Sequence, residues 1–121
     1  MTEFLRHVAL AALHWTTVYP GVRRRQVDAA RMTMTIYRFD PGGRFPLHHP
    51  QEQLVVVLEG AVTFAGAGQA VTVTPEHVLI VPPDVPHEAV AGPAGALVVS
   101  VVAPARRSAA DCPTAARPGG G

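Results

Sequence analysis

Short stretches of apolar residues, some of them alternating with polar residues, recur along this chain. Residues 32–39 run Met-Thr-Met-Thr-Ile-Tyr-Arg-Phe, and this period-2 alternation over several positions predicts a half-buried β-strand. Residues 69–73 alternate in the same way. Continuous apolar runs predict four further strands, over residues 53–58, 61–64, 77–81 and 96–102.

Turn-forming residues separate the predicted strands. Turns are expected at 40–43, 59–60, 66–68, 75–76 and 92–95. The chain contains 12 prolines and 11 glycines, a composition that favours short strands over long helices. Strands spaced about 8–12 residues apart, with turns between them, indicate an all-β sandwich or barrel. The pattern of residues 4–15 leaves a short amphipathic helix and a first strand equally open.

Two of the predicted strands, residues 53–58 and 77–81, are apolar on both faces. One face of such a strand can point into a barrel, but the other face must also be covered. A homodimer formed sheet to sheet would cover it, so we expect the chain to pair with a second copy of itself.

A length of 121 residues indicates one domain. We expect an N-terminal extension with the first strand or strands over residues 1–30 and a β-barrel over residues 31–103. From residue 104 onward the composition reduces largely to Ala, Pro, Arg and Gly, which predicts a flexible C-terminal tail over 104–121.

Charge and cysteine content narrow the possible partners and the compartment. The net charge is +1, and Arg23-Arg24-Arg25 is the densest basic cluster. Without interleaved aromatic residues, we interpret it as a solvated surface rather than a nucleic-acid patch. Cys112 is the only cysteine, so no intrachain disulfide can form. No segment approaches the roughly 20 apolar residues that span a bilayer. These features predict a cytoplasmic protein that binds neither nucleic acid nor membrane.

Metal-binding chemistry is concentrated just before one apolar strand. The segment His48-His49-Pro50-Gln51-Glu52-Gln53 brings imidazoles, amides and a carboxylate to the start of the strand over 53–58. Such groups at the mouth of a hydrophobic strand fit a metal site inside a small barrel. The other histidines, at positions 7, 14 and 77, are isolated and receive no role, whereas His87 follows a rigid loop that contains three prolines.

These residues resemble the two motifs of the cupin superfamily. The first motif has the form G-x5-H-x-H-x3,4-E-x6-G. The chain matches its opening from Gly42 to His48 and its close from Gln53 to Gly60, with Gln53 at the position of the glutamate ligand. The second motif resembles residues 81–87, with His87 as its last ligand. The chain departs from the second motif at Glu76, Asp84 and Ala91, and the resemblance extends from about residue 32 to 102. It implies a single-domain cupin β-barrel, the jelly-roll or double-stranded β-helix.

The resemblance implies that one divalent transition-metal ion (Fe, Mn, Ni, Cu or Zn) is bound by His48, His49, Gln53 and His87. All four donors are neutral, so the charge of the ion would stay largely uncompensated, which suits an anionic or enolate-forming substrate. The family spaces its first two histidines by one residue, but here they are adjacent. Either an irregularity near Pro50 turns both rings inward, or one histidine is lost to the site; a metal-free barrel is a third possibility.

The chain resembles small single-domain cupins, one branch of which linearises unsaturated uronates with an acidic residue and a Pro-x-Arg element. Here Pro104-Ala105-Arg106 matches that element, so Arg106 is a candidate to bind a substrate carboxylate, but Ser100 stands where the acidic residue is expected. Two functions are therefore expected. One is a metal-dependent isomerase, cyclase, lyase or dioxygenase, with Glu52 as a candidate for proton transfer. The other is a non-catalytic ligand-binding or accessory cupin.

Overall fold

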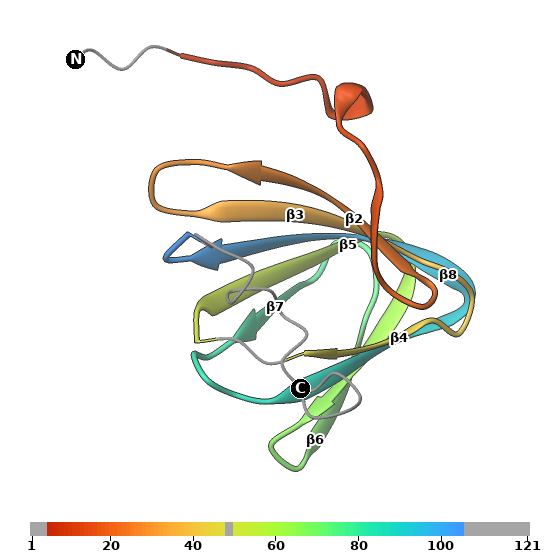
Figure 1. Ribbon diagram of the computed structural model, residues 1–121. Coiled ribbons are helices and arrows are strands. Elements are labelled where there is room, and N and C mark those ends of the chain that lie inside the picture. Colours follow the sequence, from red (N-terminus) through yellow and green to blue (C-terminus); the bar gives the residue numbers. More distant parts are fainter. Residues whose placement is uncertain (1–4, 48–49, 106–121) are drawn as a thin grey trace.

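The computed structural model describes residues 5–47 and 50–105, which form eight strands and one short 3-10 turn. The elements in chain order are η1 (Leu10–Ala12), β1 (Thr16–Tyr19), β2 (Val22–Asp28), β3 (Thr33–Phe39), β4 (Arg44–Leu47), β5 (Glu52–Gly66), β6 (Gln69–Val73), β7 (Val78–Val81) and β8 (His87–Ala103). Every strand pairing is antiparallel, in the order β1-β2-β3-β8-β5-β6, with β4 also paired to β8 and β7 to β5. The sheet curves around a central core, which confirms the predicted all-β barrel (Figure 1).

Two long strands, β5 and β8, replace three of the predicted shorter strands, those over 53–58, 61–64 and 96–102. The turn expected at 59–60 is wrong, because β5 continues through it to Gly66. The chain bends there without reversing, as the pairing of β5 with β8 shifts register on both sides of Gly60. Gly60 has φ +78°, and a Cβ atom on it would collide with the backbone carbonyl of Gly95. Likewise β8 runs from His87 through the glycines that predicted a turn at 92–95. Glycine here permits a bulge and a close approach of two strands rather than a turn.

The N-terminal segment is neither of the two alternatives expected for it. Residues 5–15 contain only η1 and are otherwise without regular structure, and residues 5–12 are exposed and stand apart from the barrel (Figure 1). The segment is held at its C-terminal end by β2, where Arg25 Nε donates a hydrogen bond of 3.0 Å to the Leu13 carbonyl. The Arg25 guanidinium also lies 4.2 Å from the centre of the Trp15 ring. The arginine cluster is therefore more than a solvated surface, because cation–π stacking fastens the chain before β1.

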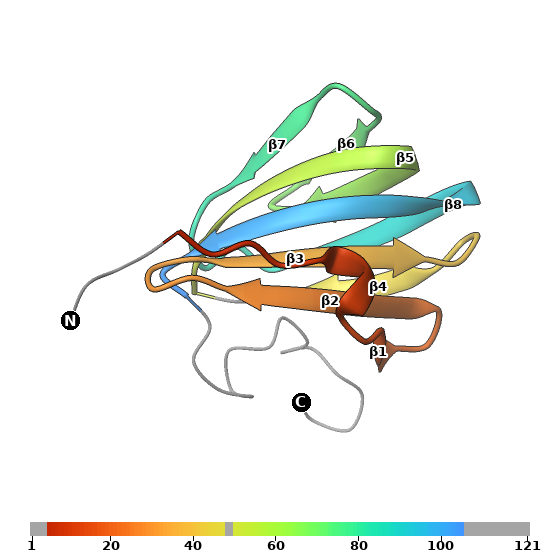
Figure 2. The ribbon, with the colours of Figure 1, turned by 90° about the horizontal axis from the view of Figure 1, so that it is seen from above.

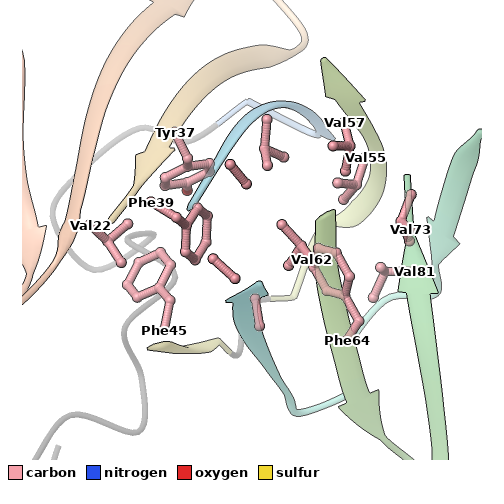
Figure 3. Close-up of a cluster of buried hydrophobic side chains, with 14 residues drawn as sticks. Val22, Tyr37, Phe39, Phe45, Val55, Val57, Val62, Phe64, Val73 and Val81 are labelled. Carbon is pink, nitrogen blue, oxygen red and sulfur yellow. The ribbon is translucent and has the colours of Figure 1, made fainter. Parts of the chain in front are cut away.

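The core lies between the inward faces of the strands. Figure 3 shows aromatic and branched side chains that converge there from β2, β3, β4, β5, β6 and β7. Phe45 is completely buried, and its ring centre lies 5.5 Å from that of Tyr37 and 5.9 Å from that of Tyr19. Buried positions alternate along the first half of β5, as the pleat requires. β3 is different, because it buries three consecutive residues, 35–37. Figure 2 shows β5, β6 and β7 at one end of the molecule and β1 and β2 at the other.

The described part of the chain contains no helix with the length and hydropathy that a membrane span requires.

Candidate metal centre

Gln53 is the second residue of β5, and its side chain points into the barrel with 2% of its surface exposed. Its amide nitrogen donates a hydrogen bond of 2.5 Å to the Ser100 hydroxyl on β8. Ser100 is itself buried at 1% exposure. Because this bond uses Nε2, the carbonyl oxygen Oε1 is the atom that Gln53 would present to a cation. An amide oxygen is a suitable ligand for a divalent ion.

His87 begins β8 directly after the proline-rich loop over residues 82–86. Its Nδ1 lies 2.8 Å from the carbonyl oxygen of Val85, which can only accept a hydrogen bond. Nδ1 must therefore carry the proton, and in the neutral ring Nε2 holds the lone pair that binds metals. Nε2 is buried. The imidazole also lies beside Phe64 of β5, with 6.1 Å between ring centres.

Three of the predicted site residues, His48, His49 and Arg106, lie outside the described residues. β4 ends at Leu47, whose backbone pairs with that of His87. The two histidines thus follow in sequence directly after the residue opposite His87, and the chain is buried again at Gln51. Among residues 5–47 and 50–105, no three His, Cys, Asp or Glu side chains gather at a common point.

Glu52 and Gln53 point to opposite faces of β5, as strand alternation predicts. Glu52 is exposed on the outer face, so it does not face Gln53 across the barrel interior. The buried polar residues of the described chain are all uncharged, namely Thr33, Thr35, Gln51, Gln53 and Ser100. The sequence pattern did not predict the hydrogen bond between Ser100 and Gln53. The only available signal was that Ser100 shares the inward parity of its buried neighbours Val98 and Val102 on β8.

Two hollows lie next to these residues. The first is inside the barrel, bounded by Gln53, Ser100 and a group of aromatic rings, and has room for about one water molecule. The second is a cleft of about 140 Å³ near the ends of β5, β6 and β7, and His87 forms part of its wall. Phe64 lines both hollows and so stands between them.

Comparisons with known proteins agree on one family. Residues 35–102 match the model of the Cupin domain, a range that covers both motifs described above. The chain is similar to the structure of an RmlC-like cupin from Shewanella frigidimarina, with 23% identity, a TM-score of 0.76, and coverage of 88% of this chain and 97% of that one.

Two further structures have higher identity. KdgF from Halomonas sp. is 28% identical with a TM-score of 0.70, over 78% of this chain and 89% of that one. The polyketide cyclase RemF from Streptomyces resistomycificus is 26% identical with a TM-score of 0.70, over 84% of this chain and 80% of that one. A search of curated proteins finds no match.

Proposed function

The chain belongs to the cupin superfamily. We propose that it is a metal-dependent isomerase, cyclase, lyase or dioxygenase that acts on a small oxygenated or anionic molecule. His48, His49, Gln53 and His87 would hold one divalent transition-metal ion. The observation that carries the proposal is the orientation of two of these donors, Gln53 and His87. Gln53 and His87 are each oriented by a hydrogen bond that leaves the ligating atom identified.

The donor set fits such an ion on chemical grounds. Imidazole nitrogens and an amide oxygen suit first-row divalent metals, and the described interior contains no buried charged side chain. When bound, the metal would act as a Lewis acid towards a carbonyl or enolate oxygen, or would provide a binding position for O₂.

The remaining roles belong to the chain itself. The Val85 carbonyl holds the His87 ring in one tautomer, and the Ser100 hydroxyl holds the Gln53 amide in one orientation. The buried ring of Phe64 keeps an apolar wall beside the imidazole, which limits access of water to the site. Arg106 remains a proposed contact for a substrate carboxylate, although Ser100 in place of an acidic residue does not favour the uronate reaction.

One observation favours a non-catalytic binding or accessory role as the second candidate. The barrel interior is filled by Val, Phe and Tyr side chains, so its inner cavity admits about one water molecule. The similarity to a polyketide cyclase and the cleft beside His87 favour the enzyme.

Purified protein is expected to retain, or to recover on incubation with Fe, Mn, Ni or Zn, about one equivalent of metal per chain. Elemental analysis and titration calorimetry measure this. His87→Ala should lose the ion, whereas His77→Ala, at an exposed histidine after β6, should keep it. Less than about 0.2 equivalents in every case would contradict the metal site.

In the Co²⁺-loaded protein, a visible spectrum that azide changes would indicate an open coordination position and favour the enzyme. A spectrum unaffected by azide would favour the binding role.

The outer face of β5, β7 and β8 supports the proposed homodimer. Leu54 on β5 pairs with Ile80 of β7 on one side and with Val101 of β8 on the other. Leu54 is 46% exposed and Ile80 is 63% exposed. These directly opposed side chains form a row of apolar residues across three strands. An exposed apolar face can be buried against the same face of a second copy about a two-fold axis, so a second copy of the chain is the proposed occupant.

We expect light scattering at micromolar concentration to give the mass of a dimer and Leu54→Glu to give that of a monomer, because two opposed carboxylates would be buried at the interface. Thr72→Glu, at an exposed position of β6, is the control that should remain dimeric. A monomeric wild type would rule the dimer out.

A cytoplasmic location and the division into an N-terminal extension (1–30), a barrel (31–103) and a C-terminal tail (104–121) likewise stay proposals.

A further inference from the structure

The cleft beside His87 has an almost uniformly apolar lining. It is bounded by the end of β5 with the following turn, by β6, by β7 and by the loop after β7. Of the residues in its wall, only Gln69 and His87 carry polar side-chain atoms, and none is Asp, Glu, Lys or Arg. Among the described strand pairings, β6 and β7 each pair with β5 and not with each other, which leaves the gap that the cleft occupies.

The deeper part of the cleft is the part best suited to a ring. Phe64 and Val81 line it and are buried at 7% and 6% exposure, and they lie close to one another in the core (Figure 3). The imidazole of His87 completes this wall, tilted by 40° to the Phe64 ring. Two aromatic planes at one wall favour stacked or edge contacts with a third. Nearer the opening, Val71 is 42% exposed, so a bound ligand could bury apolar surface there.

Size and charge together restrict the occupant. The cleft volume of about 140 Å³ is close to that of an engineered apolar cavity, roughly 150 Å³, that binds benzene. It can therefore enclose about one six-membered ring while further atoms extend outward. In the metal-free protein, a carboxylate or phosphate placed there would lose its water without gaining an Arg or Lys partner from the described lining, which is costly.

We propose that this cleft binds an uncharged, flat apolar ring, packed against Phe64 and the His87 imidazole. The inference deepens the proposed function and rests on it for the role of His87. It narrows the substrate class from oxygenated or anionic molecules to ring compounds whose enclosed part is neutral, such as phenols, enols and cyclic ketones.

Three probes test the class of ligand: 2-naphthol, 2-naphthoate and galacturonate. The full chain is titrated with each, with and without one equivalent of Zn²⁺, by calorimetry and by amide NMR shifts. In the metal-free protein, 2-naphthol should bind at least about tenfold more tightly than 2-naphthoate, which has the same rings and an added charge. The largest amide shifts caused by 2-naphthol should fall on β6 and β7. Equal or tighter binding of 2-naphthoate or galacturonate to the metal-free protein would overturn the proposal.

A pair of neighbouring substitutions on β6 tests the location. Val71 lines the cleft, whereas Thr72 does not and is hydrogen-bonded to Thr63 at 2.8 Å on the other face of the strand. Val71→Glu should weaken 2-naphthol binding by about tenfold or more, with metal content unchanged, and Thr72→Glu should leave binding unaltered. Equal effects of the two changes would contradict the location. Both positions are exposed, and their NMR spectra report whether the fold is kept.

The outcomes separate this inference from the proposed function. Metal retention without 2-naphthol binding to either form would refute the ring site and leave the metal centre standing. Binding of 2-naphthol by a chain that takes up no metal would refute the metal centre and support the ring site.

Discussion

Replacing Gln53 by alanine is expected to weaken binding of a divalent metal by more than about 100-fold, judged against the 10–100-fold typical for residues that only orient a ligand. The side chain is buried, and its amide is already aligned by Ser100. The variant would remove one donor outright and leave the Ser100 hydroxyl without this partner. Calorimetric titration with Zn²⁺ or Ni²⁺, and metal analysis after dialysis, measure the change.

Two further variants make this result specific. Ser100→Ala should weaken the same affinity by about 10–100-fold, because it loosens the orientation of Gln53 without removing the ligand. Gln69→Ala, at the exposed first residue of β6, removes an amide away from Ser100 and should leave the affinity unchanged. If Gln53→Ala retains metal as the wild type does, the assignment of Gln53 as a ligand is wrong.

Replacing Phe45 by alanine is expected to cost about 3–5 kcal/mol of unfolding free energy. The side chain is fully buried, and its ring packs against those of Tyr19, Tyr37 and Phe39. Removing the ring would leave a cavity among β1, β3 and β4, which carry these four aromatic residues. For a domain of this size, such a loss lowers the melting temperature by more than about 10 °C.

Thermal and urea unfolding of metal-free protein measure the Phe45 effect, since bound metal would itself stabilise the fold. Met32→Ala is the control, because Met32 is also a large apolar residue but lies just before β3 and is 48% exposed. Its cost should stay within about 0.5 kcal/mol, as for other surface positions. A Phe45→Ala loss no larger than that of Met32→Ala would show that this aromatic group does not stabilise the core.

Local patterns predicted the strands where alternation or continuous apolar runs were clear. The strands over 33–39, 69–73 and 78–81 lie where the sequence places them, because burial on one face imposes a period of two residues. The inward direction of Gln53 and the outward direction of Glu52 followed from the same rule. The cupin family was evident from the spacing of Gly42, His48, Gln53 and Gly60 and from His87.

The same patterns failed where glycine has two possible uses. Gly60 and Gly95 have positive φ and predicted chain reversals, yet they lie within the two longest strands. A residue with positive φ serves a turn or a bulge equally well, and the choice depends on which strand passes beside it. Gly60 is required because the backbone of Gly95 approaches it, a contact between residues 35 positions apart.

The sequence by itself therefore determined the family, the strand pattern and the kinds of donor available for a metal. Only the tertiary structure decided that Ser100 orients Gln53, that the Val85 carbonyl selects the tautomer of His87, and that Arg25 fastens the N-terminal segment beside Trp15. The physical reason is the range of the interactions. Strand alternation is a property of consecutive residues, whereas the Gln53–Ser100 bond and the cleft beside His87 arise where distant strands meet.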